Sequence, residues 1–230
     1  MRLQLNAARA CRGDWSLKAE GTFGEGVHLV SGDVGSGKST LALMMAGLLS
    51  LSNGTIARNG ISSSMISLQF PEYHVTGSTV AEECMSWGLD PGPILSELNL
   101  MDKQDRAPLT LSRGELKRLH LACMLVKKYD LLLLDEPFSS LDAREKERIC
   151  KLISQRTSGI TVLFTHEQTT FPSVDYLWEI QQGKLIERGE MPGALHHWTH
   201  APVLIKKLIA SGKCLKNISP SDLIEAVCMT

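Results

Sequence analysis

The sequence predicts an α/β fold built on a parallel core sheet, in which a glycine-rich loop connects a buried strand to a helix. Residues 27–30 form a short apolar run that suits the strand, and residues 41–46 have the apolar character of a helix packed on a sheet. Residues 32–40 lie between them and satisfy the phosphate-loop pattern of Gly, four residues, Gly-Lys and then Ser or Thr. This order of strand, loop and helix is the context in which the pattern predicts phosphate binding.

The residue types in this loop suit the phosphates of a nucleotide. Glycines let successive backbone N–H groups point toward phosphate oxygens. Lys38 would reach the β- and γ-phosphates, Ser39 would ligate Mg²⁺, and the helix that we expect to begin at Thr40 adds its positive end. The alternative is a glycine-rich turn that meets the pattern by chance. The predicted phosphate-binding residues are Gly32, Asp33, Val34, Gly35, Ser36, Gly37, Lys38, Ser39 and Thr40.

The N-terminal part of the chain is expected to add an antiparallel β subdomain to this core. Residues 2–6 and 16–19 alternate polar and apolar side chains, as half-exposed antiparallel strands do. Asn-Gly turns bracket residues 55–58, which suits a small β element, and residues 65–68 form another short strand.

Helices and buried strands alternate in the middle of the chain. Residues 80–128 have a helical composition, interrupted at the prolines of residues 91–93 and at Pro108, and form a predicted helical subdomain. Residues 131–134 and 160–164 are short, apolar and bounded by charged or turn residues, which is typical of buried parallel strands.

The last third of the chain completes the predicted fold. A charged helix over residues 143–155 lies between the two buried strands, and residues 176–187 have the pattern of a hairpin. After Pro192 the chain becomes a short helical tail. We therefore divide the chain into a nucleotide-binding domain, residues 1–192, and a helical C-terminal extension, residues 193–230.

Bulk properties disfavour several classes of protein. The formal net charge of −1 and the pI of about 6.7 give no global basic field for nucleic acid, so none is expected as a partner. The apolar runs are too short to cross a bilayer, and no signal peptide opens the chain. The six cysteines are scattered without metal-ligand spacing, so we expect reduced thiols and a cytoplasmic protein.

Two carboxylates follow the predicted strand at residues 131–134. In phosphate-loop enzymes the first such carboxylate belongs to the Mg²⁺ shell, while a neighbouring polar residue orients the attacking water. Asp135 is therefore the candidate metal residue, and Glu136 is the candidate general base or the residue that positions the attacking water. The alternative is a strand followed by an acidic turn.

Further motifs, in order along residues 1–190, resemble those of the ABC-type ATPases. Residues 111–115, Leu-Ser-Arg-Gly-Glu, are similar to that family's signature sequence, and residues 139–142 resemble its D-loop. His166, after an apolar strand, resembles the family's switch histidine, and Gln69 resembles its Q-loop glutamine.

The resemblance implies an ABC-type nucleotide-binding domain that hydrolyses ATP with Mg²⁺. Two such domains would enclose two ATP molecules head to tail, with Ser112, Gly114 and the D-loop residue Asp142 facing the partner's ATP. His166 would contact the γ-phosphate, and Gln69 would touch Mg²⁺ or the attacking water and couple the site to a neighbouring subunit.

Three departures from the family pattern qualify this resemblance. Arg113 stands where the signature usually has glycine, which keeps open whether the dimer pairs two copies or two homologous ATPases. The customary adenine-stacking tyrosine is missing, and Trp15 is the best aromatic substitute, the alternative being a plain packing role. The interval between Gln69 and Leu111 is short, which predicts a shortened helical subdomain.

Two segments resemble the ATPases of energy-coupling factor transporters, which power the uptake of vitamins or of cobalt and nickel ions. They are the Q-loop region, residues 69–83, and the tail, residues 201–225, although an amphipathic tail can also pack simply on its own domain. The resemblance implies a peripheral motor subunit on the cytoplasmic face of the membrane. Its partners would be a second ATPase subunit, a transmembrane scaffold and a solute-binding membrane subunit.

A groove near the Q-loop is expected to receive the scaffold, with Glu72, Glu82 and Glu83 as its acidic lining; a solvated acidic face is the alternative. Two rival functions stay open at this point. One is a soluble ABC ATPase that acts on nucleic acid or ribosomes, and the other is the cassette of an exporter or lipid transporter.

Overall fold

A mixed sheet of nine strands organises residues 1–228, the part of the chain that the computed structural model describes. The strand order is β4–β1–β2–β9–β8–β3–β7–β6–β5. The strands are β1 (Arg2–Arg12), β2 (Trp15–Phe23), β3 (Gly26–Ser31), β4 (Asn53–Asn59), β5 (Ser64–Ser67), β6 (Leu131–Asp135), β7 (Ile160–Phe164), β8 (Tyr176–Gln181) and β9 (Lys184–Glu190).

The predicted parallel core is confirmed. β3 pairs in parallel with β7 and β8, β7 with β6, and β6 with β5. Every residue of β6 and β7 is buried, because both faces of these strands are covered. Leu132 and Leu134 pack into one hydrophobic cluster, while Leu131 and Leu133 pack into another on the opposite face. The carboxyl ends of the parallel strands therefore meet at one edge of the sheet.

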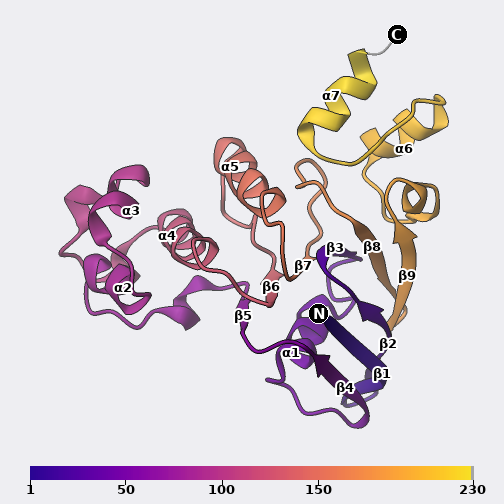
Figure 1. Cartoon of the computed structure of the whole chain (residues 1–230), viewed down its shortest axis with the longest axis horizontal. Helices are drawn as coiled ribbons and strands as arrows, with labels where there is room; N and C mark the ends of the chain where they lie inside the picture. The colour runs from indigo at the N-terminus through magenta and orange to yellow at the C-terminus, as the bar shows by residue number, and fades with distance from the viewer. Residues whose placement is uncertain (229–230) are drawn as a thin grey trace.

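The predicted antiparallel strands are also present. β1 pairs antiparallel with β2 and with β4, and β8 pairs antiparallel with β9. β1 is longer than the alternating residues 2–6 indicated, because the strand continues past a register shift between Leu5 and Ala8. Figure 1 shows β1, β2 and β4 together at the N-terminal end of the sheet, with α1 behind them.

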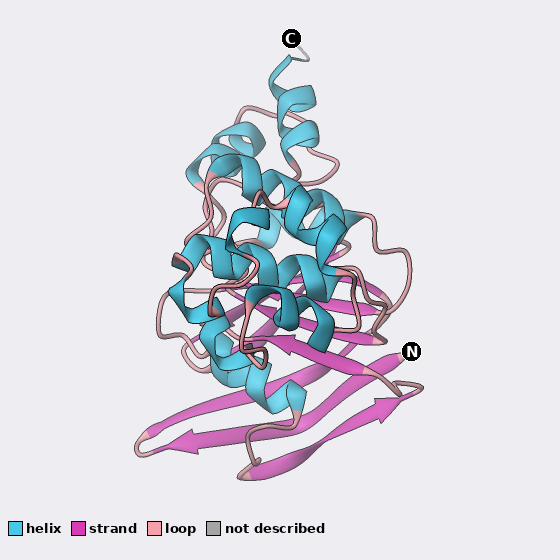
Figure 2. Ribbon diagram, turned by 90° about the vertical axis from the view of Figure 1, so that its left-hand side faces the viewer, coloured by secondary structure: helices cyan, strands magenta, loops and turns pink. Residues whose placement is uncertain are grey.

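Helices cover the sheet, and further helices lie beyond its two ends (Figures 1 and 2). Short 3₁₀ turns η1 (Pro71–His74), η2 (Met101–Lys103), η3 (Pro108–Thr110) and η4 (Gly193–His197) connect them. The α-helices are α1 (Lys38–Ala46), α2 (Val80–Ser86), α3 (Pro91–Glu97), α4 (Arg113–Leu125), α5 (Ala143–Ser154), α6 (Val203–Ala210) and α7 (Pro220–Cys228).

Two helix boundaries differ from the sequence-based expectation. α1 begins at Lys38 rather than Thr40. Gly37, the residue directly before the helix, has a φ of 113°. α3 begins at Pro91, where the prolines had suggested an interruption. Proline is compatible with the first turn of a helix, because the N–H groups there have no partner within the helix, and Asp90 caps this turn by accepting from Gly92 N at 3.0 Å.

The helical subdomain is short, as expected. α2 and α3 have seven residues each, and with α4 they enclose a hydrophobic cluster of their own. The buried members are Val80, Cys84, Leu95, Leu98, Leu100, Leu111, Leu116, Leu119, Ala122 and Cys123. In Figure 1 this subdomain lies at the end of the molecule opposite β9.

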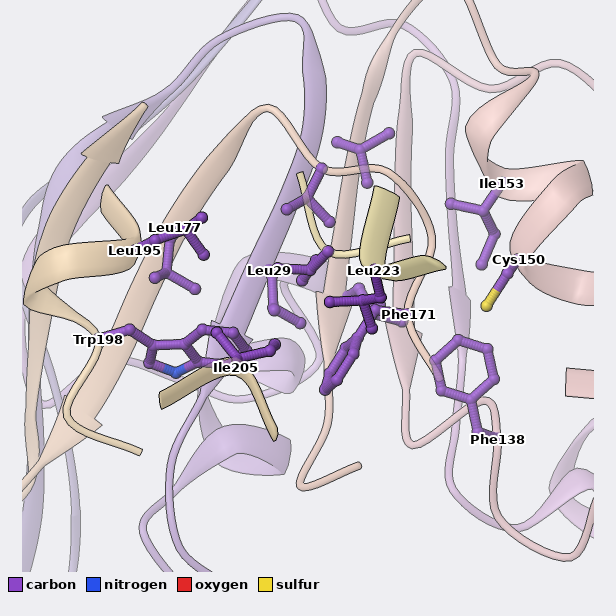
Figure 3. Packing of buried hydrophobic residues seen from close by; sticks show 14 of the residues in the cluster. Leu29, Phe138, Cys150, Ile153, Phe171, Leu177, Leu195, Trp198, Ile205 and Leu223 are labelled. Carbon is purple, nitrogen blue, oxygen red and sulfur yellow. The ribbon is translucent and has the colours of Figure 1, made fainter. Parts of the chain in front are cut away.

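The chain after β9 packs on the core of the nucleotide-binding fold. Trp198, Ile205 of α6 and Leu223 of α7 share one buried cluster with Leu29 of β3 and Leu177 of β8 (Figure 3). Burial of such side chains contributes roughly 1.5–3 kcal/mol each. The C-terminal helices are therefore attached to the sheet by apolar packing as well as by the chain.

Candidate nucleotide-binding site

The phosphate loop follows β3 at the carboxyl edge of the sheet. Two of its glycines are required because neighbouring atoms leave no room for a side chain. A Cβ at Gly37 would lie 2.8 Å from the ring of Trp15. A Cβ at Gly32 would lie 2.9 Å from the carbonyl oxygen of Ile180, and its φ is 150°. Larger residues at these two positions would push the loop away from the sheet.

Lys38 is held inside the loop. Its Nζ donates to the carbonyl oxygens of Gly32 at 2.8 Å and Asp33 at 3.0 Å, and it lies 3.8 Å from Glu136 Oε1. Burial lowers the pKa of Lys38, and the nearby carboxylates of Glu136 and Asp135 oppose this shift. The ammonium group is thus fixed next to the carboxylates that follow β6.

Asp135 and Ser39 form an oxygen pair that fits a magnesium ion. Asp135 is 3% exposed at the end of β6, and burial raises the pKa of its carboxyl group, whereas a hydrogen bond from Ser39 lowers it. Its Oδ1 has no hydrogen-bond partner among the described residues. A buried carboxylate oxygen that lacks a partner beside a hydroxyl is the donor chemistry that Mg²⁺ prefers.

Glu136 and His166 lie side by side next to this pair. Glu136 is 6% exposed and has a φ of 48°, a conformation that non-glycine residues rarely adopt outside functional or strained positions. Its N–H donates to Phe164 O of β7 at 2.9 Å, which fixes the backbone. Its Oε1 lies 2.7 Å from His166 Nδ1, and its Oε2 accepts from Thr165 Oγ1 at 3.1 Å. The carboxylate is held from both sides.

Lys38, Ser39, Glu136 and His166 open into one cavity of about 410 Å³, whereas Asp135 is buried and does not line it. Its lining includes ten of the predicted residues, Trp15, Val34, Gly35, Gly37, Lys38, Ser39, Thr40, Gln69, Glu136 and His166, together with Arg12, whereas Gly32, Asp33 and Ser36 of the loop do not line it. Trp15 is half-buried there, with its ring against Gly37, which suits stacking or packing, so its adenine role stays a prediction. Arg12 was not predicted from the sequence. Arg12 pairs with Trp15 across the β1–β2 turn, so the register of this hairpin is the feature that would have indicated its place at the cavity.

A family profile described as ABC transporter matches residues 22–139. The chain belongs to the ABC transporter family. The ABC ATPase therefore binds ATP and hydrolyses it.

Two curated relatives are energy-coupling factor transporter ATP-binding proteins. EcfA2 of Thermotoga maritima is 29% identical over 229 residues, which cover 87% of this chain and 86% of the relative. EcfA of Pediococcus pentosaceus is 30% identical over 187 residues, which cover 70% of this chain and 66% of the relative.

Two solved structures have the same fold. A protein described as a cobalt transport ATP-binding protein superposes with a TM-score of 0.64 and 25% identity, covering 80% of this chain and 78% of the other. RNase-L Inhibitor superposes with a TM-score of 0.68 at 20% identity, covering 86% of this chain and 41% of that chain, which shows the fold alone.

The signature residues of this ABC ATPase lie outside the cavity. Ser112 caps α4 in a capping box with Glu115, whose pKa falls to about 2, chiefly through its hydrogen bond from Lys103. A Cβ at Gly114 would lie 2.9 Å from Ser140 O. Arg113 has 74% of its side chain exposed, and its Nε lies 3.8 Å from Glu72 Oε1. The signature thus leaves its helix end accessible despite the arginine.

The remaining predicted residues have mixed outcomes. Asp142 caps α5 by accepting from Glu145 N at 2.9 Å and does not line the cavity, so its role toward nucleotide stays a prediction. The expectation that Glu83 lines an acidic groove is wrong. Glu83 is only 3% exposed. Its carboxylate accepts from the backbone N–H groups of Thr76 and Gly77, each at 2.8 Å, and so serves the local backbone instead of a surface groove.

The segment after β9 contacts the base of the phosphate loop. Trp198 Nε1 donates to Ser31 Oγ at 2.8 Å, directly before the loop. His200 lies between two carboxylates, with Nδ1 2.6 Å from buried Glu179 Oε1 and Nε2 3.4 Å from Asp33 Oδ2. Burial acts to raise the pKa of Glu179, but hydrogen bonds, chiefly from His200, hold it below its usual value. The loop is therefore supported from the C-terminal side.

Within residues 1–228, the helices are all too short or too polar to cross a membrane.

Proposed function

We propose that this ABC ATPase is the motor subunit of a membrane importer of the energy-coupling factor type, for a vitamin or for cobalt or nickel ions. The similarity to EcfA2 of Thermotoga maritima carries this proposal, because it covers 87% of this chain and 86% of the relative. It therefore extends well beyond residues 22–139, which any member of the family would share. The protein described as a cobalt transport ATP-binding protein adds support.

The cavity residues have separate roles in this proposal. The loop from Gly32 to Thr40 binds the phosphates of ATP, with the buried Lys38 ammonium at the β- and γ-phosphates. Ser39, Asp135 and Gln69 would hold Mg²⁺, which would neutralise charge on the phosphates when bound. Trp15 contacts the adenine ring.

Glu136 is the proposed general base. Its carboxylate accepts the proton of the attacking water, while His166, 2.7 Å away, holds the carboxylate in place and contacts the γ-phosphate. Thr165 fixes the second carboxylate oxygen at 3.1 Å. This arrangement keeps the base oriented before the nucleotide arrives.

The site is completed by a second ATPase subunit. Ser112, Gly114 and Asp142 lie away from their own cavity, which suits contact with ATP bound to the partner. The partner is a second copy of this chain or a homologous ATPase. Contact through the γ-phosphate closes the dimer, and hydrolysis opens it.

Exposed apolar side chains support the proposed partners. On residues 193–230, the C-terminal extension to domain 1–192, Val203 and Ile224 are 68% and 64% exposed, which suits contacts between ATPase subunits. Beside the Q-loop, Phe70 and Tyr73 form an edge-to-face pair and are 44% and 73% exposed, which suits docking of a transmembrane scaffold. A solute-binding membrane subunit completes the complex, and the ATPase lies on the cytoplasmic face of the membrane.

An affinity pull-down tests the proposal. Glu136→Gln is incubated with ATP and detergent-solubilised native membranes, and the bound proteins are identified by mass spectrometry. We expect a multi-span scaffold and a small membrane protein, with both lost in the Lys38→Ala control because that variant binds ATP poorly. Recovery of ribosomes or nucleic-acid-binding proteins instead would overturn the importer function and leave the ATPase intact.

A further inference from the structure

A buried lysine lies beneath the loop that carries Gln69. Lys117, on α4, is 1% exposed, and its Nζ donates to the carbonyl oxygens of Leu68 at 3.3 Å and Gln69 at 3.1 Å. Burial lowers the pKa of Lys117 to about 8, although attraction to Asp135 and Glu136 partly opposes this shift. An ammonium group is costly to bury, so its contacts with the Q-loop backbone are the compensation that the fold provides.

A histidine pair holds the same backbone from the other side. The N–H of Leu68 donates to His74 Nε2 at 2.9 Å, so this nitrogen carries no proton and the ring is neutral. The His74 ring stacks on His120, with centroids 4.2 Å apart and an interplanar angle of 18°. His120 follows Lys117 by three residues on α4, which places both side chains on one face of the helix. Both polar groups of the Leu68 backbone are therefore fixed by this cluster.

We infer that Lys117 is a positioning residue for ATP hydrolysis, which holds the Q-loop backbone so that the Gln69 side chain stays at the nucleotide cavity. Gln69 lines that cavity, whereas Lys117 does not reach it. The inference rests on the proposed role of Gln69.

The placement of Lys117 also connects two parts of the site. α4 begins directly after Ser112, so the helix that presents the signature to a partner's ATP also carries the group that holds the Q-loop. Any movement of α4 would therefore displace the backbone carbonyls of Leu68 and Gln69 that Lys117 holds.

Steady-state ATPase measurements on the full chain test this inference with Lys117→Met, Lys117→Arg, Gln69→Ala and the Lys117→Met/Gln69→Ala double variant. We expect Lys117→Met to lower kcat on the order of tenfold, as small misplacements of a reacting group do. KM for ATP should change little, since the phosphate loop is untouched. Lys117→Arg keeps the cation and should recover most of the turnover. In the Gln69→Ala background, Lys117→Met should cause no further loss.

Arg156→Met is the matched control. Arg156 also donates to two loop carbonyls, those of Lys127 and Tyr129 at 3.2 Å each, in the segment that leads into the amino end of β6. It should lower thermal stability without changing kcat. If Lys117→Met fails to fold in thermal unfolding, Lys117→Gln replaces it in the same comparison.

The outcomes distinguish the catalytic role of Gln69 from the positioning role of Lys117. Unchanged kcat in Lys117→Met, or losses that multiply in the double variant, would overturn the positioning role while Gln69 keeps its own. Normal turnover of Gln69→Ala would remove the proposed role of Gln69, and the positioning role with it.

Discussion

His28 on β3 is built into the fold in its neutral form, so acid should destabilise the protein. Its Nε2–H donates to Gly24 O at 2.8 Å, and its Nδ1 accepts from Trp178 Nε1 at 3.1 Å. The ring also stacks on Tyr176 with a centroid distance of 4.5 Å. A second proton would face the indole N–H and break that bond. Burial accordingly lowers the pKa of His28 to about 4.

The sign and size of the effect follow from this shift. In the unfolded chain the histidine takes up its proton near pH 6.5, whereas the folded protein resists protonation until about pH 4. The stabilisation is therefore complete above pH 6.5 and is lost progressively as the pH falls toward 4. Between neutral pH and pH 5 this single group should lower the free energy of unfolding by about 2 kcal/mol.

Urea unfolding followed by circular dichroism, at a series of pH values from neutral to about 5, measures this loss. Wild type is compared with His28→Gln, which does not titrate at this position. His74 and His120 also have lowered pKa values through burial, but they remain in both proteins. The difference in slope therefore belongs to His28. Parallel stability curves for the two proteins would refute the assignment.

The remaining predictions concern the nucleotide cavity and its support. Lys38→Ala should weaken ATP binding about tenfold or more by calorimetry, and unchanged binding would exclude Lys38 from the site. Glu136→Gln should bind ATP, turn over about 100-fold more slowly or worse, and accumulate as a dimer in gel filtration; parental turnover would exclude it as the base. Trp15→Ala should weaken ATP binding by about 1 kcal/mol or more, whereas no change would mean that the ring only packs. Trp198→Phe should lower the free energy of urea unfolding by about 1 kcal/mol, because the buried Ser31 hydroxyl loses its donor; an unchanged value would show that this bond contributes nothing.

The sequence predicts a segment well when one physical requirement accounts for its order of apolar, polar and glycine residues. Residues of β6 and β7 read as continuous apolar runs because both faces of each strand are covered. The carboxylates after β6 were predicted as site residues because they follow a buried apolar strand in a chain that also has a phosphate loop. The loop itself was predicted because few residue orders allow the backbone to approach phosphate.

The misses have causes that a single sequence does not display. Arg12 reaches the cavity only because β1 and β2 pair in a particular register. Glu83 was taken as a surface charge, since nothing local shows that two backbone N–H groups require its carboxylate. Lys117 and His120 were not singled out from the sequence, because only tertiary packing covers the helix face on which they lie.

The contacts of Trp198 and His200 with the base of the phosphate loop have a mechanical consequence. A displacement of the segment after β9 would reach the base of the phosphate loop through two contacts, the hydrogen bond from Trp198 to Ser31 and the 3.4 Å approach of His200 to Asp33. This segment and the phosphate loop are therefore coupled mechanically at Ser31 and Asp33. A chain shortened to residue 192 would lose both links and leave the loop without that support, so separating the extension from the domain would alter nucleotide binding as well as assembly.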